Sequence, residues 1–193
     1  MSDKKYTNPS TIALHTGWRK DETTNSVTAP IHMTSSYQFD STDHAANLFA
    51  LGELGNIYSR IMNPTNAVFE DRIAALEGGV AALGLASGQG ASAYAIQNLC
   101  SHGDNFVASS QLYGGTYNQF KNPFSDMGIE VRFVDPTDPE NFEKATDDKT
   151  RAYFAETLPN PKLHVFPISE VAEIGENHVI PLIVDNTPAP SLV

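Results

Sequence analysis

The sequence contains one cysteine, few basic residues and no long apolar run, and each shortage argues against a class of protein. Cys100 cannot form an internal disulfide, and its place at the end of an expected helix suits a small buried apolar residue. The sequence has 12 lysine and arginine residues and 23 aspartate and glutamate residues, which gives a formal net charge of -11. Because this charge repels phosphate backbones, we expect no binding to nucleic acid or to an anionic membrane.

The amino terminus also lacks an apolar stretch of signal-peptide length. No segment approaches the roughly 20 apolar residues that a membrane span requires. We therefore expect a cytoplasmic protein. Since 40% of the 193 residues are hydrophobic, the chain can bury a sizeable core, and a globular protein that acts on small molecules is the favoured interpretation.

Several familiar catalytic motifs are missing as well. The sequence has no Gly-Lys pair for a P-loop, no His-Glu-x-x-His and no paired cysteines for zinc. A serine-hydrolase elbow needs glycine two residues before and two residues after the serine, whereas Ser87 has Leu85 and Gln89 there. The six histidines are scattered, so we expect no metal site.

The pattern of the chain changes near residue 65. Residues 1–65 show little periodicity apart from a short helix expected at 43–51. A helix is then expected from Pro64 to the glycines at 78 and 79. Beyond it, apolar segments alternate with helical ones. The expected strands are 80–86, 106–108, 129–134, 152–155 and 182–184, and the expected helices run to Cys100 and follow Gly115 and Pro139.

This alternation predicts an α/β fold with a mostly parallel sheet covered by helices on both faces. Ligands of such sheets bind where the strands end. Ser87–Gly90, after the first expected strand, is a glycine-rich turn that feeds a helix amino terminus, which suits a phosphate. Plain turn geometry is the alternative. The same turn matches the dinucleotide fingerprint G-x-G-x-x-A, so a Rossmann protein stays possible, although the next strand ends in Ser109-Ser110 where that fold needs an acid.

Three further features can be interpreted in two ways. Asp185 closes an apolar strand and fits either a partner for a cationic ring nitrogen or a cap for the following turn. Tyr113 fits either an aromatic core or helix-start residue or a residue that stacks on a cofactor ring. Arg60, in Tyr58-Ser59-Arg60, fits either a solvated charge or a phosphate ligand, because its planar fork donates two hydrogen bonds.

Together these segments resemble the Cys/Met-metabolism enzymes that depend on pyridoxal phosphate (PLP). The resemblance covers nearly the whole chain. Residues 39–51 and 55–58 are most similar to O-acetylhomoserine sulfhydrylases. The segments that carry the resemblance are Thr11–Gly17, Tyr58–Thr65, Glu77–Gly79, Ala86–Gln89, Leu112–Tyr117, Glu156–Pro161 and Val184–Thr187.

The resemblance implies a PLP-dependent transferase of fold type I, in which residues 1–65 form an arm on a neighbouring subunit and residues 66–193 form part of the cofactor domain. Gly88 and Gln89 would bind the PLP phosphate, and Tyr58 and Arg60 would reach the phosphate of the neighbouring subunit. The active site would then be shared between protomers of a homodimer or homotetramer.

The resemblance also assigns roles around the cofactor ring. Tyr113 would stack on the ring and act in proton transfer, and Asp185 would hold the ring nitrogen. Asn160 would lie near the ring hydroxyl or the substrate, and Thr187 would line the opposite face.

The implied reaction is γ-replacement, in which O-acetylhomoserine and sulfide, or methanethiol, give homocysteine or methionine. The family's Schiff-base lysine lies beyond the strand-end acid, and none of the seven lysines here has that context; we interpret Lys162 as an exposed loop charge. We therefore expect an amino-terminal portion, without the carboxy-terminal domain, that is inactive alone. A cystathionine γ-synthase, a methionine γ-lyase and a PLP-binding fragment without catalysis are the related alternatives.

Overall fold

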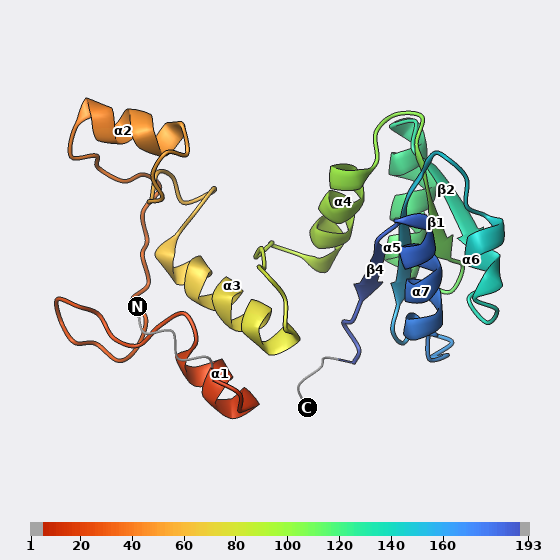
Figure 1. Cartoon of the computed structure of the whole chain (residues 1–193), viewed down its shortest axis with the longest axis horizontal. Helices are drawn as coiled ribbons and strands as arrows, with labels where there is room; N and C mark the ends of the chain where they lie inside the picture. The colour runs from red at the N-terminus through yellow and green to blue at the C-terminus, as the bar shows by residue number, and fades with distance from the viewer. Residues whose placement is uncertain (1–5, 190–193) are drawn as a thin grey trace. The chain divides into compact units, whose positions relative to one another are not determined.

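The computed structural model describes residues 6–189, and the chain divides after Gly84 into two compact units (Figure 1). The helix that starts at Pro64 belongs to the first of these units. The boundary between an arm and a cofactor domain near residue 65 concerns function and stays a prediction. None of the helices in residues 6–189 is long and apolar enough to cross a membrane.

The first unit contains three helices within its described residues. They are α1 (Pro9–His15), α2 (Thr42–Phe49) and α3 (Pro64–Glu77). The expected helices near 43–51 and from Pro64 are confirmed, whereas α1 was not expected. Asn63 caps α3 by accepting the Thr65 N–H, and Gly78 ends it at a φ of 68°, a left-handed conformation that favours glycine.

Arg72 fixes α1 against α3. Its guanidinium donates from Nε to the Thr16 carbonyl and from Nη2 to the Leu14 carbonyl, each at 3.0 Å. These bonds satisfy carbonyl groups at the end of α1, which a helix cannot satisfy by itself. The irregular first unit is therefore organised around the α1–α3 pair.

The second unit is a four-stranded parallel sheet in the order β2-β1-β3-β4. Its strands are β1 (Asn105–Ser109), β2 (Glu130–Val134), β3 (Thr150–Glu156) and β4 (Leu182–Asp185). Its helices are α4 (Gly88–Leu99), α5 (Gly114–Gln119), which continues into the π-helix η1 (Phe120–Phe124), α6 (Glu140–Lys144) and α7 (Ile168–His178). The predicted parallel α/β arrangement is confirmed.

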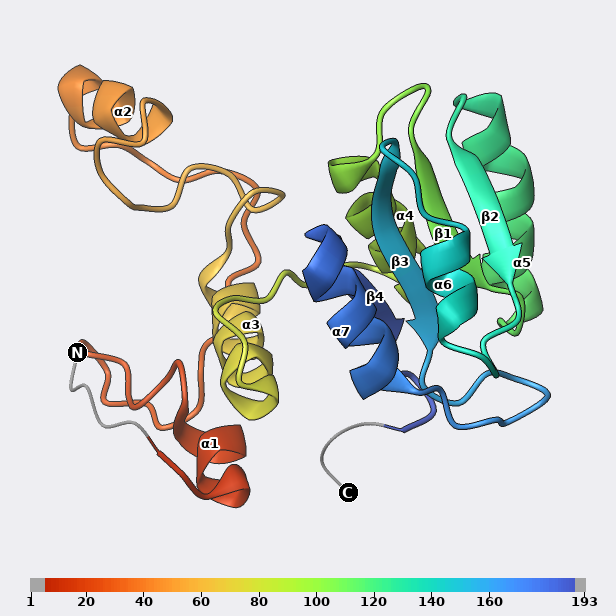
Figure 2. The same cartoon turned by 45° about the vertical axis from the view of Figure 1, so that its right-hand side comes forward.

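Helices cover both faces of this sheet, with α6 and α7 in front of it and α4 and α5 behind it in Figure 2. Alternate residues of the strands supply the two cores because side chains along a strand point to opposite faces. Phe106 and Phe154 pack with Phe120 on the α4 and α5 side. Val107 and Tyr153 pack on the α6 and α7 side. The sheet is therefore buried on both faces, as parallel sheets are.

The prediction of a strand at residues 80–86 is wrong. These residues form no strand in the structure, and Val80 and Leu83 are exposed. Backbone N–H and C=O groups of a strand need a neighbouring strand, and none of the four described strands pairs with this segment. The apolar run therefore indicated a propensity for strand, but it did not show that a neighbouring strand pairs with it.

Candidate functional site

The carboxyl ends of β1, β3 and β4 lie along one edge of the sheet, where parallel α/β proteins bind ligands. Glu156 and Asp185, the last residues of β3 and β4, are direct neighbours in register. The amino terminus of α5 follows β1 at the same edge, and hydrogen bonds join it to the start of α4. Four chain segments therefore meet there.

The start of α4 offers free backbone donors. Ser87 caps the helix by accepting the Gly90 N–H at 3.1 Å, whereas the N–H groups of Gly88 and Gln89 donate to no acceptor among the described residues. A Cβ atom built on Gly88 would meet nothing within 4 Å, so the space in front of the turn is open. Free N–H groups at a helix amino terminus facing open space fit a phosphate group.

Gln89 holds this turn against α5. Its side-chain Nε2 donates to Thr116 Oγ1 at 2.9 Å, and Gln119 Nε2 donates back to the Gln89 carbonyl at 3.0 Å. Thr116 is fully buried, so the contact is anchored in the core of the second unit. The side chain of Gln89 is therefore used to fix the turn, and its backbone N–H is what remains for a ligand.

Asp185 uses one carboxylate oxygen and leaves the other free. Its Oδ1 accepts the Thr187 N–H at 3.0 Å and the Thr187 hydroxyl at 2.6 Å. This is the turn cap that was one of the two sequence interpretations. Oδ2 makes no hydrogen bond or ion pair with a described residue, so it can accept a bond from a protonated ring nitrogen.

Tyr113 presents its ring to solvent just before α5, with the residue 53% exposed. A Cβ on Gly115 would lie 2.5 Å from Tyr113 Cε1, so the glycine lets the ring lie close against the chain. Any larger residue at position 115 would displace the ring. The core interpretation of Tyr113 is therefore wrong, whereas its position at the start of α5 agrees with the helix-start interpretation, and its exposed ring also fits a stacking role.

Glu156 is a buried acid that the sequence analysis did not single out. It is 4% exposed, and its carboxylate accepts the Tyr113 N–H at 2.8 Å, with the Asn160 backbone N–H nearby. Burial raises the pKa of this carboxyl group, and the nearby charge of Asp185 raises it further, while the two N–H groups act in the opposite direction. The sequence did carry a signal, because Glu156 ends an apolar strand just as Asp185 does.

Tyr58 and Arg60 lie together in the first unit. The guanidinium carbon of Arg60 is 5.8 Å from the centroid of the Tyr58 ring, and no hydrogen bond or ion pair joins this guanidinium to a described residue. Both side chains line a hollow of about 600 Å³ with Asn63 and Thr65. The fork of Arg60 is thus open to an anion.

The structure therefore divides the eight predicted site residues. Asn160 is exposed on the loop after β3, where its backbone contacts Glu156. Lys162 is exposed, as expected. The strand-end group in the second unit comprises Gly88, Gln89, Tyr113, Asn160, Asp185 and Thr187, and the group in the first unit comprises Tyr58 and Arg60.

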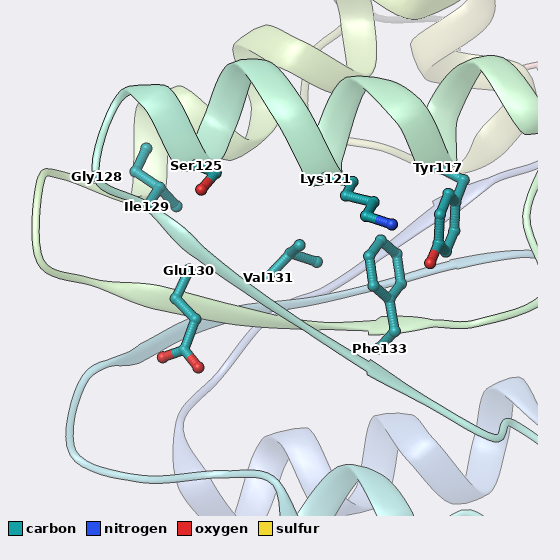
Figure 3. Close-up of a pocket in the computed structure, with 8 residues that line it drawn as sticks. All are labelled: Tyr117, Lys121, Ser125, Gly128, Ile129, Glu130, Val131 and Phe133. Atoms are coloured by element: carbon teal, nitrogen blue, oxygen red, sulfur yellow. The ribbon is translucent and has the colours of Figure 1, made fainter.

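A separate hollow of about 480 Å³ lies between η1 and the edge strand β2 (Figure 3). The rings of Tyr117 and Phe133 stack there with centroids 4.3 Å apart, and Lys121 lies 5.8 Å from the Tyr117 centroid. None of the predicted site residues lines this hollow. The strand-end group and the hollow are therefore different places on the second unit.

These features define a cofactor-binding α/β protein. The edge of its parallel sheet carries a helix amino terminus with free N–H groups, an exposed aromatic ring and an acid with one free oxygen. The chain matches the Cys/Met metabolism PLP-dependent enzymes over residues 10–193, and it belongs to that family. Family membership decides against the Rossmann interpretation. PLP is the cofactor of the family, and the free donors at α4 and the free Oδ2 of Asp185 fit its phosphate and its ring nitrogen.

Individual relatives agree with this assignment. The chain is 56% identical over 186 residues to an O-acetyl-L-homoserine sulfhydrylase of Leptospira meyeri, covering 96% of the chain and 42% of that protein. A Campylobacter jejuni protein described as an O-acetylhomoserine (thiol)-lyase, with pyridoxyl-lysine phosphate, has a TM-score of 0.91 at 41% identity, covering 94% of this chain and 44% of that one. The chain thus spans about two fifths of the length of these relatives.

A cystathionine γ-lyase of Lactobacillus plantarum, solved with L-serine, has a TM-score of 0.86 at 31% identity. The match covers 96% of this chain and 46% of that structure. Enzymes with different names therefore share this part of the fold, and the fold alone does not select one reaction among them.

Proposed function

We propose that the chain serves a PLP-dependent γ-replacement in which O-acetylhomoserine and sulfide, or methanethiol, give homocysteine or methionine. The observation that carries the proposal is the strand-end group, where free N–H groups at Gly88 and Gln89 lie at the same sheet edge as the free Oδ2 of Asp185. The 56% identity to a protein named as an O-acetyl-L-homoserine sulfhydrylase supports the choice of substrate.

In this proposal the start of α4 binds the phosphate. The N–H groups of Gly88 and Gln89 donate to its oxygens, and the positive end of the helix dipole favours its charge. Thr116 and Gln119 keep the turn in place through Gln89, so the donors are fixed before the ligand arrives.

Three residues act on the ring. Asp185 Oδ2 accepts the ring N–H and keeps the nitrogen protonated, and Tyr113 stacks on the ring and holds a hydroxyl within reach for proton transfer. Thr187, whose N–H and hydroxyl are fixed by Asp185, lines the other face. When bound, PLP supplies an electron sink for negative charge that develops on the substrate.

Asn160 completes the ring contacts. Its backbone N–H lies near Glu156, and its exposed side chain is free to meet the ring hydroxyl or the substrate. An amide suits this place because it offers both a donor and an acceptor.

We further propose that Tyr58 and Arg60 bind the cofactor phosphate of a neighbouring subunit in a homodimer or homotetramer. The open guanidinium fork of Arg60 supports this role. The first unit also exposes large apolar side chains, including Met33 and Leu54, which are more than 90% exposed. Exposed apolar surface of this kind is typical of a protein interface.

Equilibrium titration of the chain with PLP, followed by absorbance, tests the proposal. We expect saturable binding that inorganic phosphate weakens by competition for the α4 turn. A nicotinamide dinucleotide should not compete. Binding of the dinucleotide without binding of PLP would overturn the proposal.

A second candidate is a related cystathionine γ-synthase, which forms cystathionine, or a methionine γ-lyase, which cleaves methionine, and the likeness to cystathionine γ-lyase favours this group. The two candidates differ in the substrate that the PLP-loaded chain prefers. Tighter binding of O-acetylhomoserine than of cystathionine, measured by calorimetry, supports the sulfhydrylase proposal. The reverse order supports the second candidate.

A further inference from the structure

Glu156 is the most deeply buried acid at the strand ends, and the roles proposed above leave it without one. Its residue is 4% exposed, and no lysine, arginine or histidine among the described residues pairs with it. A buried carboxylate without a cation is costly unless hydrogen bonds compensate for its lost hydration. The bonds that Glu156 accepts therefore indicate why it is there.

The groups around this carboxylate belong to the backbone of predicted cofactor contacts. The carboxylate accepts the N–H of Tyr113 at 2.8 Å, at the start of α5, and the N–H of Asn160, on the loop after β3, lies nearby. The two residues lie 47 positions apart in the sequence. A single side chain thus joins the segment that presents the aromatic ring to the segment that presents the amide.

Asp185 lies beside Glu156 in register, with β3 and β4 as neighbours (Figure 2). Two carboxylates at adjacent strand ends repel each other, so this placement lowers stability when both are ionised. A requirement for stability alone does not account for it. The same placement puts a second negative charge next to the oxygen that would meet a cationic ring.

We propose that Glu156 is the positioning residue of the cofactor site, and that its buried carboxylate fixes the backbone of Tyr113 and Asn160 so that both side chains meet the ring. This inference rests on the proposed PLP site. It assigns Glu156 no contact with substrate or cofactor. Its effect on the ligand passes through the two loops, chiefly through Tyr113, for which the bond length is 2.8 Å.

Glu156→Gln tests the inference, because the variant keeps the size of the side chain and loses the charge and one of the two acceptor oxygens. Hydrogen exchange without PLP should show the Tyr113 or Asn160 amide exchanging about tenfold faster, as loss of a charge-assisted hydrogen bond predicts. PLP affinity should fall about tenfold. The matched control is Glu173→Gln, which removes the same charge from an exposed position on α7 and should change neither quantity.

A double-mutant cycle separates positioning from a general loss of structure. If Glu156 acts through Tyr113, the affinity loss of Glu156→Gln combined with Tyr113→Ala is smaller than the product of the two single losses. Independent losses, or unchanged exchange at both amides, would overturn the inference. Because exchange is measured without cofactor, failure of the chain to bind PLP would sink the proposed function and leave this result standing. If Glu156→Gln does not fold, Glu156→Asp, which keeps the charge and shortens the reach, carries the same measurements.

Discussion

The two ends of the parallel sheet are built differently. At the amino end, Asn105 donates to Asp147 at 2.8 Å and accepts the Thr150 hydroxyl at 2.7 Å, and Arg132 pairs with Asp147 at 2.8 Å. At the carboxyl end, by contrast, Asp185 keeps one oxygen free, and the buried side-chain oxygen of Gln111 has no partner among the described residues.

This difference separates stability from function within one sheet. A polar network in which every member is satisfied stabilises the fold, whereas donors and acceptors left free are available to a ligand. The comparison therefore predicts that changes at the amino end alter unfolding, and that changes at the carboxyl end alter binding.

Asn105→Ala should produce the largest effect. Asn105 is 1% exposed, and its removal takes one hydrogen-bond partner from Asp147 and one from the buried Thr150 hydroxyl, so the free energy of unfolding should fall by about 2–4 kcal/mol. Hydrogen exchange of the slowest β3 amides measures this loss. Asn186→Ala, at the other end of the sheet, removes one partly buried bond to Thr157 and serves as the control, with an expected loss of about 1 kcal/mol or less. Equal losses would contradict the comparison.

Asp185→Asn should have the next largest effect, on binding alone. The variant keeps Oδ1 for Thr187 and loses the anionic Oδ2, so PLP affinity should fall about 10- to 100-fold, while the free energy of unfolding should not fall because the repulsion of Glu156 is removed. Asp135 provides a close control because its Oδ1 accepts the N–H and hydroxyl of Thr137 in the same Asp-x-Thr turn after β2. Asp135→Asn should leave PLP binding unchanged. Weaker binding in both variants, measured by titration, would show that the turn rather than the acid matters.

The sequence indicated the polar groups of the candidate site more directly than it indicated the pairing of strands. Asp185 and Ser87–Gly90 were singled out because an acid or a glycine turn after an apolar run is a local pattern, and their roles stay predictions. The strand expected at 80–86 failed because pairing depends on a neighbour that no local pattern names. Glu156 shares the strand-end pattern of Asp185, but its role was overlooked since the backbone N–H of Tyr113 that it binds carries no sequence signature.

Helix α7 was not expected either. Its buried positions, Val171 and Gly175, are spaced as on a helix, but a glycine inside a helix argues against that assignment. The structure gives the reason for the glycine. A Cβ on Gly175 would lie 2.6 Å from the Ile180 carbonyl oxygen, so close approach of the chain into β4 requires its absence.

The stability of the two ends of the sheet should depend on pH with opposite signs. The pKa of Asp147 is lowered, first by its bond from Asn105 and then by Arg132, so its contribution to stability is present above its ordinary pKa of 3.8 and is lost as pH falls below it. The pKa of Glu156 is raised above 4.5, chiefly by burial, so its ionisation lowers stability as pH rises through its folded pKa. The free energy of unfolding of the second unit should therefore fall both at low pH, through Asp147, and as pH rises above 4.5, through Glu156.

Substitutions test whether Asp147 and Glu156 cause the losses of stability at low and at higher pH. Asp147→Asn should reduce the loss of stability below pH 4, and Glu156→Gln should reduce the decline above pH 4.5. Amide exchange across β3 at several pH values, corrected for the intrinsic exchange rate, provides the measurement. If Glu156→Gln changed the acid slope instead, the assignment of opposite signs to the two ends would be wrong.

Thr116→Val should have the smallest effect, and it should change both the free energy of unfolding and the affinity for PLP. Valine keeps the buried volume of Thr116 and removes the hydroxyl that accepts the Gln89 side chain, which is only partly buried and can turn to water. We expect a loss of about 0.5–1.5 kcal/mol in unfolding free energy. PLP affinity should fall severalfold, because the free N–H groups at Gly88 and Gln89 stay in place but are held less firmly.

Thr150→Val, at the amino end, is the matching change, since the Thr150 hydroxyl also bonds Asn105 and the Asp147 N–H. It should destabilise the sheet more than Thr116→Val does and leave PLP affinity unchanged, and a Thr150→Val variant that lost affinity while keeping its fold would mean that the two ends are coupled.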